Sequence, residues 1–129
     1  MLSIRKQTLR GKVAVIGIGM SPVGKVPGKS PLWLAADAAK KALADAGIAA
    51  SDVDEIMLGH FNAGFSPQDF TASLVLQANP ALRFKPTTRV ENACATGSAA
   101  VHQGIRAIEA GAAKIVLVDG VEVTTSEEA

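Results

Sequence analysis

The chain has 129 residues, of which 48% are hydrophobic and 19% charged, a composition that suits one folded domain and excludes a disordered chain. Its 13 basic and 12 acidic residues give a net charge of +1, which argues against nucleic acid or an anionic membrane as the main partner. A single cysteine excludes an internal disulfide, and the sequence has no Cys/His cluster typical of a metal site, so we expect a cytoplasmic protein. No apolar stretch is long enough to predict a transmembrane helix.

The first half of the chain predicts two strands with a helix between them. Residues 12–19 form an uninterrupted apolar run that ends in glycines, which is typical of a strand buried on both faces. Ser30-Pro31 predicts the start of a helix, with serine as N-cap and proline at the first helical position, and Gly47 predicts its end. Residues 55–61 predict the second strand.

The second half continues the alternation. It predicts a helix at 69–78, a strand at 86–90, a helix at 95–110 and a strand at 113–119. The resulting β-α-β-α-β-α-β order predicts an α/β fold with a mostly parallel sheet and right-handed crossovers. The helix at 95–110 has small residues on every face, which is typical of a helix packed on several sides. A single sheet can cover only one side of this helix. We therefore expect another layer of structure on its other sides, which this chain need not supply.

Cys94 is the main candidate for chemistry. It lies at the predicted junction between the strand at 86–90 and the helix at 95–110, where backbone N–H groups and the helix dipole stabilise a thiolate. A free cysteine is equally often a buried structural residue. Position alone therefore leaves both interpretations of Cys94 open.

Other candidate sites are weaker. The glycines of 17–24 do not form a dinucleotide-binding fingerprint, because Pro22 stands where a glycine is needed and a loop follows in place of a helix. No Gly-x-Ser-x-Gly motif is present, and Ser98 is expected to serve helix packing. His60 closes a strand and could line a site at the carboxyl edge of the sheet. His102 lies roughly 12 Å along the helix from Cys94, which is too far for direct contact with the thiol. Neither histidine has a convincing partner in the sequence, so both are better interpreted as structural or surface residues.

The carboxylates also have ordinary explanations. Helix capping and solvation account for Asp52, Asp54 and Glu55. Solvation or fraying accounts for three residues near the end of the sequence: Glu122, Glu127 and Glu128. None of them forms an evident general acid–base pair. Cys94 thus remains the residue on which a functional hypothesis depends.

The sequence Val90-Glu-Asn-Ala-Cys-Ala-Thr-Gly-Ser-Ala-Ala100 resembles the thiolase family. The likeness is greatest to acetyl-CoA acetyltransferases of the lipid-transfer-protein (SCP2-like) branch. Residues 15–25 are similar to the first strand and loop of that family, 52–59 to the approach to its second strand, and 113–122 to its fourth strand and Gly-Val-Glu turn. The resemblance therefore covers 12–124 in the family's order.

The resemblance implies a role for Cys94 as the nucleophile that an acyl-CoA thioester acylates. The backbone N–H of Cys94 would be one donor to the oxyanion, and the enolate of a second acyl-CoA would then attack the acyl-enzyme in a Claisen condensation, with thiolysis as the reverse. Coenzyme A thioesters are then substrates, no permanently bound cofactor is expected, and the residues that contact coenzyme A are not identified.

Thiolases are built from two halves of this type, with the cysteine helix of the first half buried between their sheets. Residues 1–129 resemble the N-terminal half and are expected to form a single domain. The family's activating histidine, its second catalytic cysteine and most of its coenzyme A loop region have no counterpart in this sequence. We therefore expect an acyltransferase that depends on a C-terminal half or partner chain, in a homo-oligomer. Two alternatives stay open: a non-catalytic, thiolase-derived binding subunit, and a condensing enzyme of the ketoacyl-synthase type.

Overall fold

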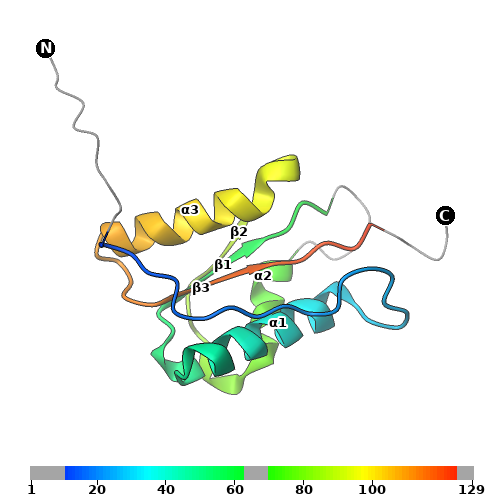
Figure 1. The fold of residues 1–129 in the computed structure, drawn as a ribbon, viewed down its shortest axis with the longest axis horizontal. Helices are drawn as coiled ribbons and strands as arrows, with labels where there is room; N and C mark the ends of the chain where they lie inside the picture. The colour runs from blue at the N-terminus through cyan, green and yellow to red at the C-terminus, as the bar shows by residue number, and fades with distance from the viewer. Residues whose placement is uncertain (1–10, 63–69, 125–129) are drawn as a thin grey trace, which may run out of the picture.

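The computed structural model describes residues 11–62 and 70–124 and has an α/β fold (Figure 1). Its strands form one parallel sheet in the order β2-β1-β3. The predicted fold class, an α/β domain with a parallel sheet, is confirmed. The main elements are α1 (Pro31–Ala46), β1 (Glu55–Gly59), α2 (Thr71–Leu74), β2 (Thr87–Val90), α3 (Thr96–Glu109) and β3 (Val116–Gly120).

The register of the sheet brings the carboxyl ends of its strands together. Gly59 at the end of β1 pairs with Val90 of β2 on one side and with Gly120 of β3 on the other. In parallel sheets, the segments that follow the strands therefore meet at this edge. The candidate site lies here.

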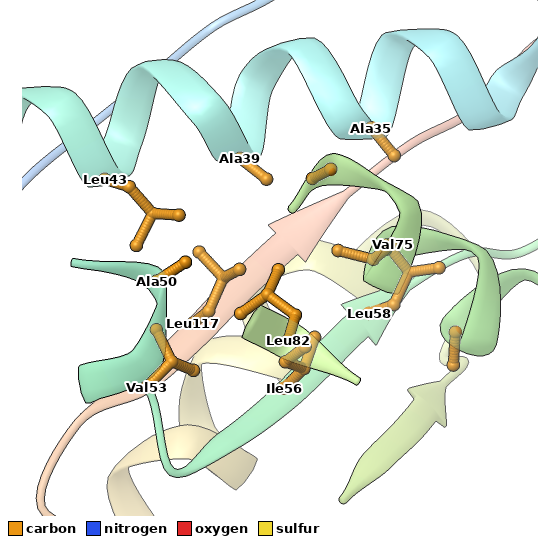
Figure 2. Packing of buried hydrophobic residues seen from close by; sticks show 12 residues of the cluster. Ala35, Ala39, Leu43, Ala50, Val53, Ile56, Leu58, Val75, Leu82 and Leu117 are labelled. Carbon is orange, nitrogen blue, oxygen red and sulfur yellow. The ribbon is translucent and has the colours of Figure 1, made fainter. Parts of the chain in front are cut away.

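Helices cover both faces of the sheet, with α1 on one side and α3 on the other (Figure 1). The main core lies under α1, where small residues of the helix face apolar side chains of the sheet (Figure 2). Because Ala35 and Ala39 are short, α1 can approach the 3₁₀ turn Val75–Ala78 and β3 closely. A smaller cluster under α3 consists of Met57, Ala107 and Ala113 with Val116 and Val118 beside them.

The ends of α1 agree with the sequence prediction. Ser30 Oγ accepts a hydrogen bond from the backbone N–H of Trp33 at 3.2 Å, and Pro31 occupies the first helical position. Gly47 ends the helix with a φ of 66°, a left-handed conformation that glycine adopts at little cost. No described helix is both long and apolar enough to cross a membrane.

The prediction of a buried strand at 12–19 is wrong. This segment has no regular secondary structure, and Val15, Ile16 and Ile18 are 81%, 55% and 74% exposed. It follows α1 closely: a Cβ atom at Gly17 would lie 2.6 Å from the carbonyl oxygen of Ala42. A strand requires a hydrogen-bonded neighbouring strand. β1 and β3 form hydrogen bonds with each other and not with residues 12–19. Within the described part of the chain, no strand pairs with this segment.

The remaining elements shift only slightly. The helix predicted at 69–78 is observed as α2 (Thr71–Leu74) and a 3₁₀ turn (Val75–Ala78), with residue 69 outside the described residues. The last strand starts later than predicted, at Val116. One side of α3 is buried against the sheet, whereas Ser98 and Val101 on its other sides are exposed. The close packing predicted on several sides of this helix, including at Ser98, is therefore not observed in this chain.

Candidate functional site

A tight turn places Cys94 between the end of β2 and the start of α3. Ala93–Ala95 forms a single 3₁₀ turn directly before the first residue of the helix. Ala93 has a φ of 44°, a conformation that costs an alanine of order 1–3 kcal/mol. The turn leaves Cys94 exposed at the carboxyl edge of the sheet.

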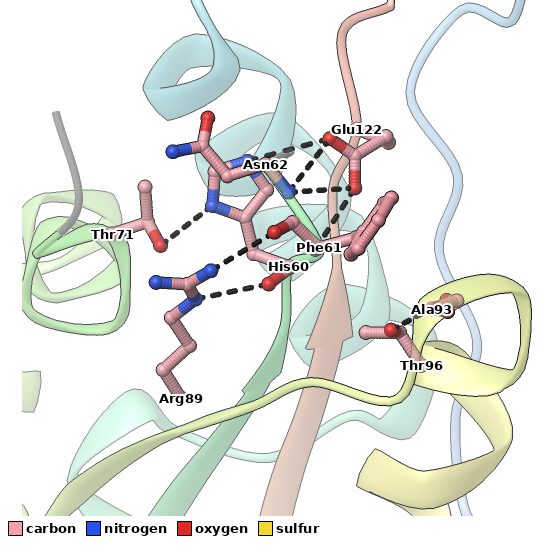
Figure 3. Close-up of polar contacts among 8 residues, drawn as sticks. All are labelled: His60, Phe61, Asn62, Thr71, Arg89, Ala93, Thr96 and Glu122. Carbon is pink, nitrogen blue, oxygen red and sulfur yellow. Dashed lines mark hydrogen bonds and ion pairs between the residues drawn. The ribbon is translucent and has the colours of Figure 1, made fainter. Parts of the chain in front are cut away.

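Side chains on both sides of the turn hold its backbone. The carboxylate of Glu91 accepts the N–H of Ala93 at 2.5 Å. Thr96 Oγ1 accepts the N–H of Asn92 at 2.8 Å. The same hydroxyl donates to the carbonyl oxygen of Ala93 at 2.7 Å (Figure 3). Thr96 is itself buried, so this hydroxyl has little competition from water. The turn that contains Cys94 is thus stabilised by hydrogen bonds within the chain.

Gly59 makes room for this arrangement. A Cβ atom at Gly59 would lie 3.2 Å from Thr96 Cγ2 and 3.3 Å from the carbonyl oxygen of Thr96, closer than most side-chain contacts. The absence of a side chain at the end of β1 therefore lets the start of α3 pack directly against the strand.

The first turn of α3 also shapes the electrostatics near Cys94. Its N-cap residue, Ala95, makes no side-chain capping bond. The first N–H groups of an α-helix have no partner within the helix and form the positive end of its dipole. The N–H groups of Ala95 and Thr96 donate to the carbonyl oxygens of Asn92 and Ala93. It is therefore the positive end of the α3 dipole beside Cys94 that favours a negative charge there.

His60 lies deeper at the same edge of the sheet and is only 1% exposed. Its Nδ1 atom is 2.9 Å from Thr71 Oγ1, and its Nε2 atom is 3.6 Å from Glu122 Oε1 (Figure 3). This burial agrees with the structural interpretation of His60. His102 is exposed on α3 and is not part of this group.

Glu122 is a residue whose role the sequence analysis missed. Its carboxylate accepts the N–H groups of Phe61 at 2.9 Å and of Asn62 at 3.1 Å. Arg89 holds the same loop from the other side: its Nε donates to the carbonyl oxygen of His60 at 2.9 Å (Figure 3). The expectation that Glu122 is merely solvated is therefore wrong. The available signal was the Gly-Val-Glu turn after β3, which the parallel sheet brings beside the end of β1.

Of the other carboxylates, Asp52 acts in capping as predicted, whereas Asp54 binds backbone groups that are distant in sequence, which neither capping nor solvation predicts. Asp52 accepts the N–H of Ala49 at 3.0 Å, and Asp54 accepts those of Lys114 at 2.8 Å and Ile115 at 3.0 Å. The hydrogen bonds from Ile115 and Lys114 lower the pKa of Asp54. Glu127 and Glu128 lie outside the described residues. Among the residues that the structure describes, no three His, Cys, Asp or Glu side chains come together in a way that could hold a metal ion.

Asp119 was not recognised from the sequence because it lies within an otherwise apolar strand. It is 7% exposed, and Oδ1 accepts the N–H of Gly120 at 2.8 Å. Its Oδ2 atom is buried with no hydrogen-bond partner among the described residues. Burial raises the pKa of Asp119 to about 7, and the bond from Gly120 opposes this only in part.

Comparison with known proteins supports the predicted family. The family model described as "Thiolase, N-terminal domain" matches residues 13–129. The acetyl-CoA acetyltransferase of Methanocaldococcus jannaschii is 41% identical over 114 residues, which cover 88% of this chain and 29% of that protein. Sterol carrier protein 2 of Homo sapiens is 35% identical over 119 residues, which cover 89% of this chain and 21% of that protein.

A solved structure shows the same fold. The acetyl-CoA acetyltransferase from Syntrophomonas wolfei is similar with a TM-score of 0.67 and 25% identity, over 81% of this chain and 27% of that chain. The chain thus spans less than a third of the length of each of these relatives. Because the family model matches nearly the whole sequence, the chain belongs to the thiolase family, in the part that corresponds to its N-terminal domain.

Proposed function

We propose that this chain supplies the nucleophile of a thiolase-type acyltransferase, and that the nucleophile is Cys94. The observation that supports this most directly is the exposure of Cys94 on a hydrogen-bonded turn immediately before α3. The relatives named acetyl-CoA acetyltransferase make an acyl-CoA thioester the expected substrate.

In the proposed reaction, the Cys94 thiolate attacks the carbonyl carbon of acetyl-CoA. A bond forms between Sγ and that carbon, the bond from carbon to the sulfur of coenzyme A breaks, and coenzyme A leaves as its thiol after taking up a proton. The backbone N–H of Cys94 would donate to the oxyanion, and the positive end of the α3 dipole beside it would favour the negative charge. Glycine, alanine and serine residues at the start of α3 leave room for the acyl group.

The second half-reaction requires groups that we do not assign to this chain. The enolate of a second acyl-CoA would attack the acyl-enzyme to form a new carbon–carbon bond and release Cys94. A general base is needed for this step. His60 is buried against Thr71, and His102 lies about two turns along α3 from Cys94. We therefore propose that the base comes from the remainder of the thiolase fold, in the same or a partner chain.

Intact-protein mass spectrometry tests this proposal. The chain is incubated with acetyl-CoA alone, or as a complex co-expressed with the part of the archaeal acetyltransferase relative that follows its matched segment. We expect a mass increase of one acetyl group in the complex, and none with Cys94→Ala or without the added part. A complex that forms but takes up no acetyl group would show that the chain is a non-catalytic binding subunit.

A further inference from the structure

Side chains at the carboxyl end of β1 alternate between the two faces of the sheet. Met57 packs in the cluster under α3, whereas Leu58 belongs to the core under α1. The alternation continues just past the strand, where the His60 ring lies against Thr71 of α2. Because neighbouring residues of an extended chain point to opposite faces, Phe61 falls on the face that α3 covers.

Phe61 and Cys94 lie at the same end of that face. A Cβ atom at Gly59 would lie 3.2 Å from Thr96 Cγ2, so the end of β1 touches the first residue of α3. Phe61 is two residues beyond Gly59, about 7 Å further toward the carboxyl edge of the sheet. Cys94 is two residues before Thr96, on the turn at the same edge. In Figure 3 the Phe61 ring is accordingly on the side of Ala93 and Thr96.

The backbone of Phe61 is held on both sides. Its N–H donates to the Glu122 carboxylate at 2.9 Å, and its carbonyl oxygen accepts from Arg89 Nη2 at 3.0 Å (Figure 3). Arg89 belongs to β2 and Glu122 follows β3, so both neighbours of β1 contribute an anchor. Phe61 itself is 39% exposed. Its ring is therefore an apolar surface at a fixed position, open on one side.

We propose that Phe61 sets the length of the acyl chain that can be attached to Cys94. This inference rests on the proposed function of Cys94. The ring packs against the methyl group of a bound acetyl group and occupies the space that a longer chain would need. One methylene more or less in an apolar pocket changes a rate roughly 10–200-fold, so a single ring is enough to separate acetyl from longer acyl groups. Short, unbranched acyl-CoA thioesters are then the substrates.

Competition between two thioesters tests this role. The co-expressed complex with the remaining part of the archaeal relative receives equal amounts of acetyl-CoA and hexanoyl-CoA, and intact-protein mass spectrometry measures both acyl-enzymes at early times. Phe61→Ala should raise the ratio of hexanoyl-enzyme to acetyl-enzyme by about tenfold or more, and Phe61→Leu should give an intermediate ratio. Phe84→Ala is the matched control, because Phe84 is 99% exposed and precedes the opposite end of β2, and it should leave the ratio unchanged.

The two proposals fail in different ways. If the original complex takes up acetyl and Phe61→Ala shows the same ratio, the role of Phe61 is overturned and Cys94 remains the nucleophile. If neither thioester adds mass, the proposed function is overturned and this inference with it.

Glu122→Ala tests the anchor of Phe61. Once the N–H of Phe61 loses its acceptor, the ring can move aside, so the ratio of hexanoyl-enzyme to acetyl-enzyme should rise. A purely structural role of Glu122 would lower both acyl-enzymes equally and leave their ratio unchanged, which would overturn the positioning role.

Discussion

Asp119 makes the stability of the isolated chain depend on pH in an unusual direction. Burial raises its pKa in the folded chain from 3.8 to about 7. An acid with a raised folded pKa holds its proton in the folded state after the unfolded state has lost it. Its contribution is therefore fully present below the unfolded pKa of 3.8 and is lost as the pH rises to about 7. Most carboxylates with a shifted pKa, including Asp54, act in the opposite sense.

The size of this effect follows from the two pKa values. Their separation is about 3 pH units, and each unit corresponds to about 1.4 kcal/mol, so the chain loses about 4 kcal/mol across this range. Asparagine keeps the shape of Asp119 but does not ionise. The Asp119→Asn chain should therefore lack this loss and be the more stable of the two above neutral pH.

Urea unfolding followed by circular dichroism measures the difference at a series of pH values from about 4 to about 8. The free energy of unfolding of Asp119→Asn minus that of the original chain should rise with pH and level off above about pH 7. Groups common to both chains cancel in this difference. A difference that does not change with pH would show that Asp119 is not a buried unpaired acid.

Three further substitutions test the local contacts. Thr96→Val should reduce acetyl transfer to Cys94 in the complex by about tenfold to a hundredfold, because the turn loses the hydroxyl that holds it. Thr96→Ser keeps the hydroxyl and should restore the rate, and an unaffected rate in Thr96→Val would contradict this reasoning. Glu122→Ala should lower the free energy of unfolding in urea by about 2 kcal/mol, since two backbone N–H groups lose a charged acceptor, whereas the exposed Glu109→Gln should not. Ser30→Ala should cost about 1 kcal/mol in the same assay through loss of the cap of α1, and no change would show that this bond adds nothing.

Local signals predicted part of the fold well. The start of α1 depends on Ser30-Pro31 and its end on Gly47, and each of these residues acts within one turn of the helix. The position of Cys94 before α3 also follows from neighbouring residues, because a strand pattern is followed closely by a helix pattern. Sequence reasoning succeeds at such places because the interactions that decide them are close in the chain.

Contacts between residues that are far apart in the sequence could not be predicted in this way. An apolar run such as 12–19 shows that burial is favourable but does not show which strand pairs with it. Glu122 and Asn62 are 60 residues apart in sequence, so their hydrogen bond could not be read from either neighbourhood. The close approach of Thr96 to Gly59 likewise exists only once β1 and α3 are packed.

The wrong prediction at 12–19 and the unrecognised Asp119 share one location, a groove of about 340 Å³ between residues 13–19 and β3. The segment 12–19 has the sequence of a buried strand, yet Val15, Ile16 and Ile18 are exposed there. Burying a side chain of this kind is worth about 1.5–3 kcal/mol, so the three together would favour filling the groove by several kcal/mol. The Cys94 turn differs, because Glu91 and Thr96 already hold it within this chain. The turn that presents the Cys94 thiol is therefore held by contacts within the described residues.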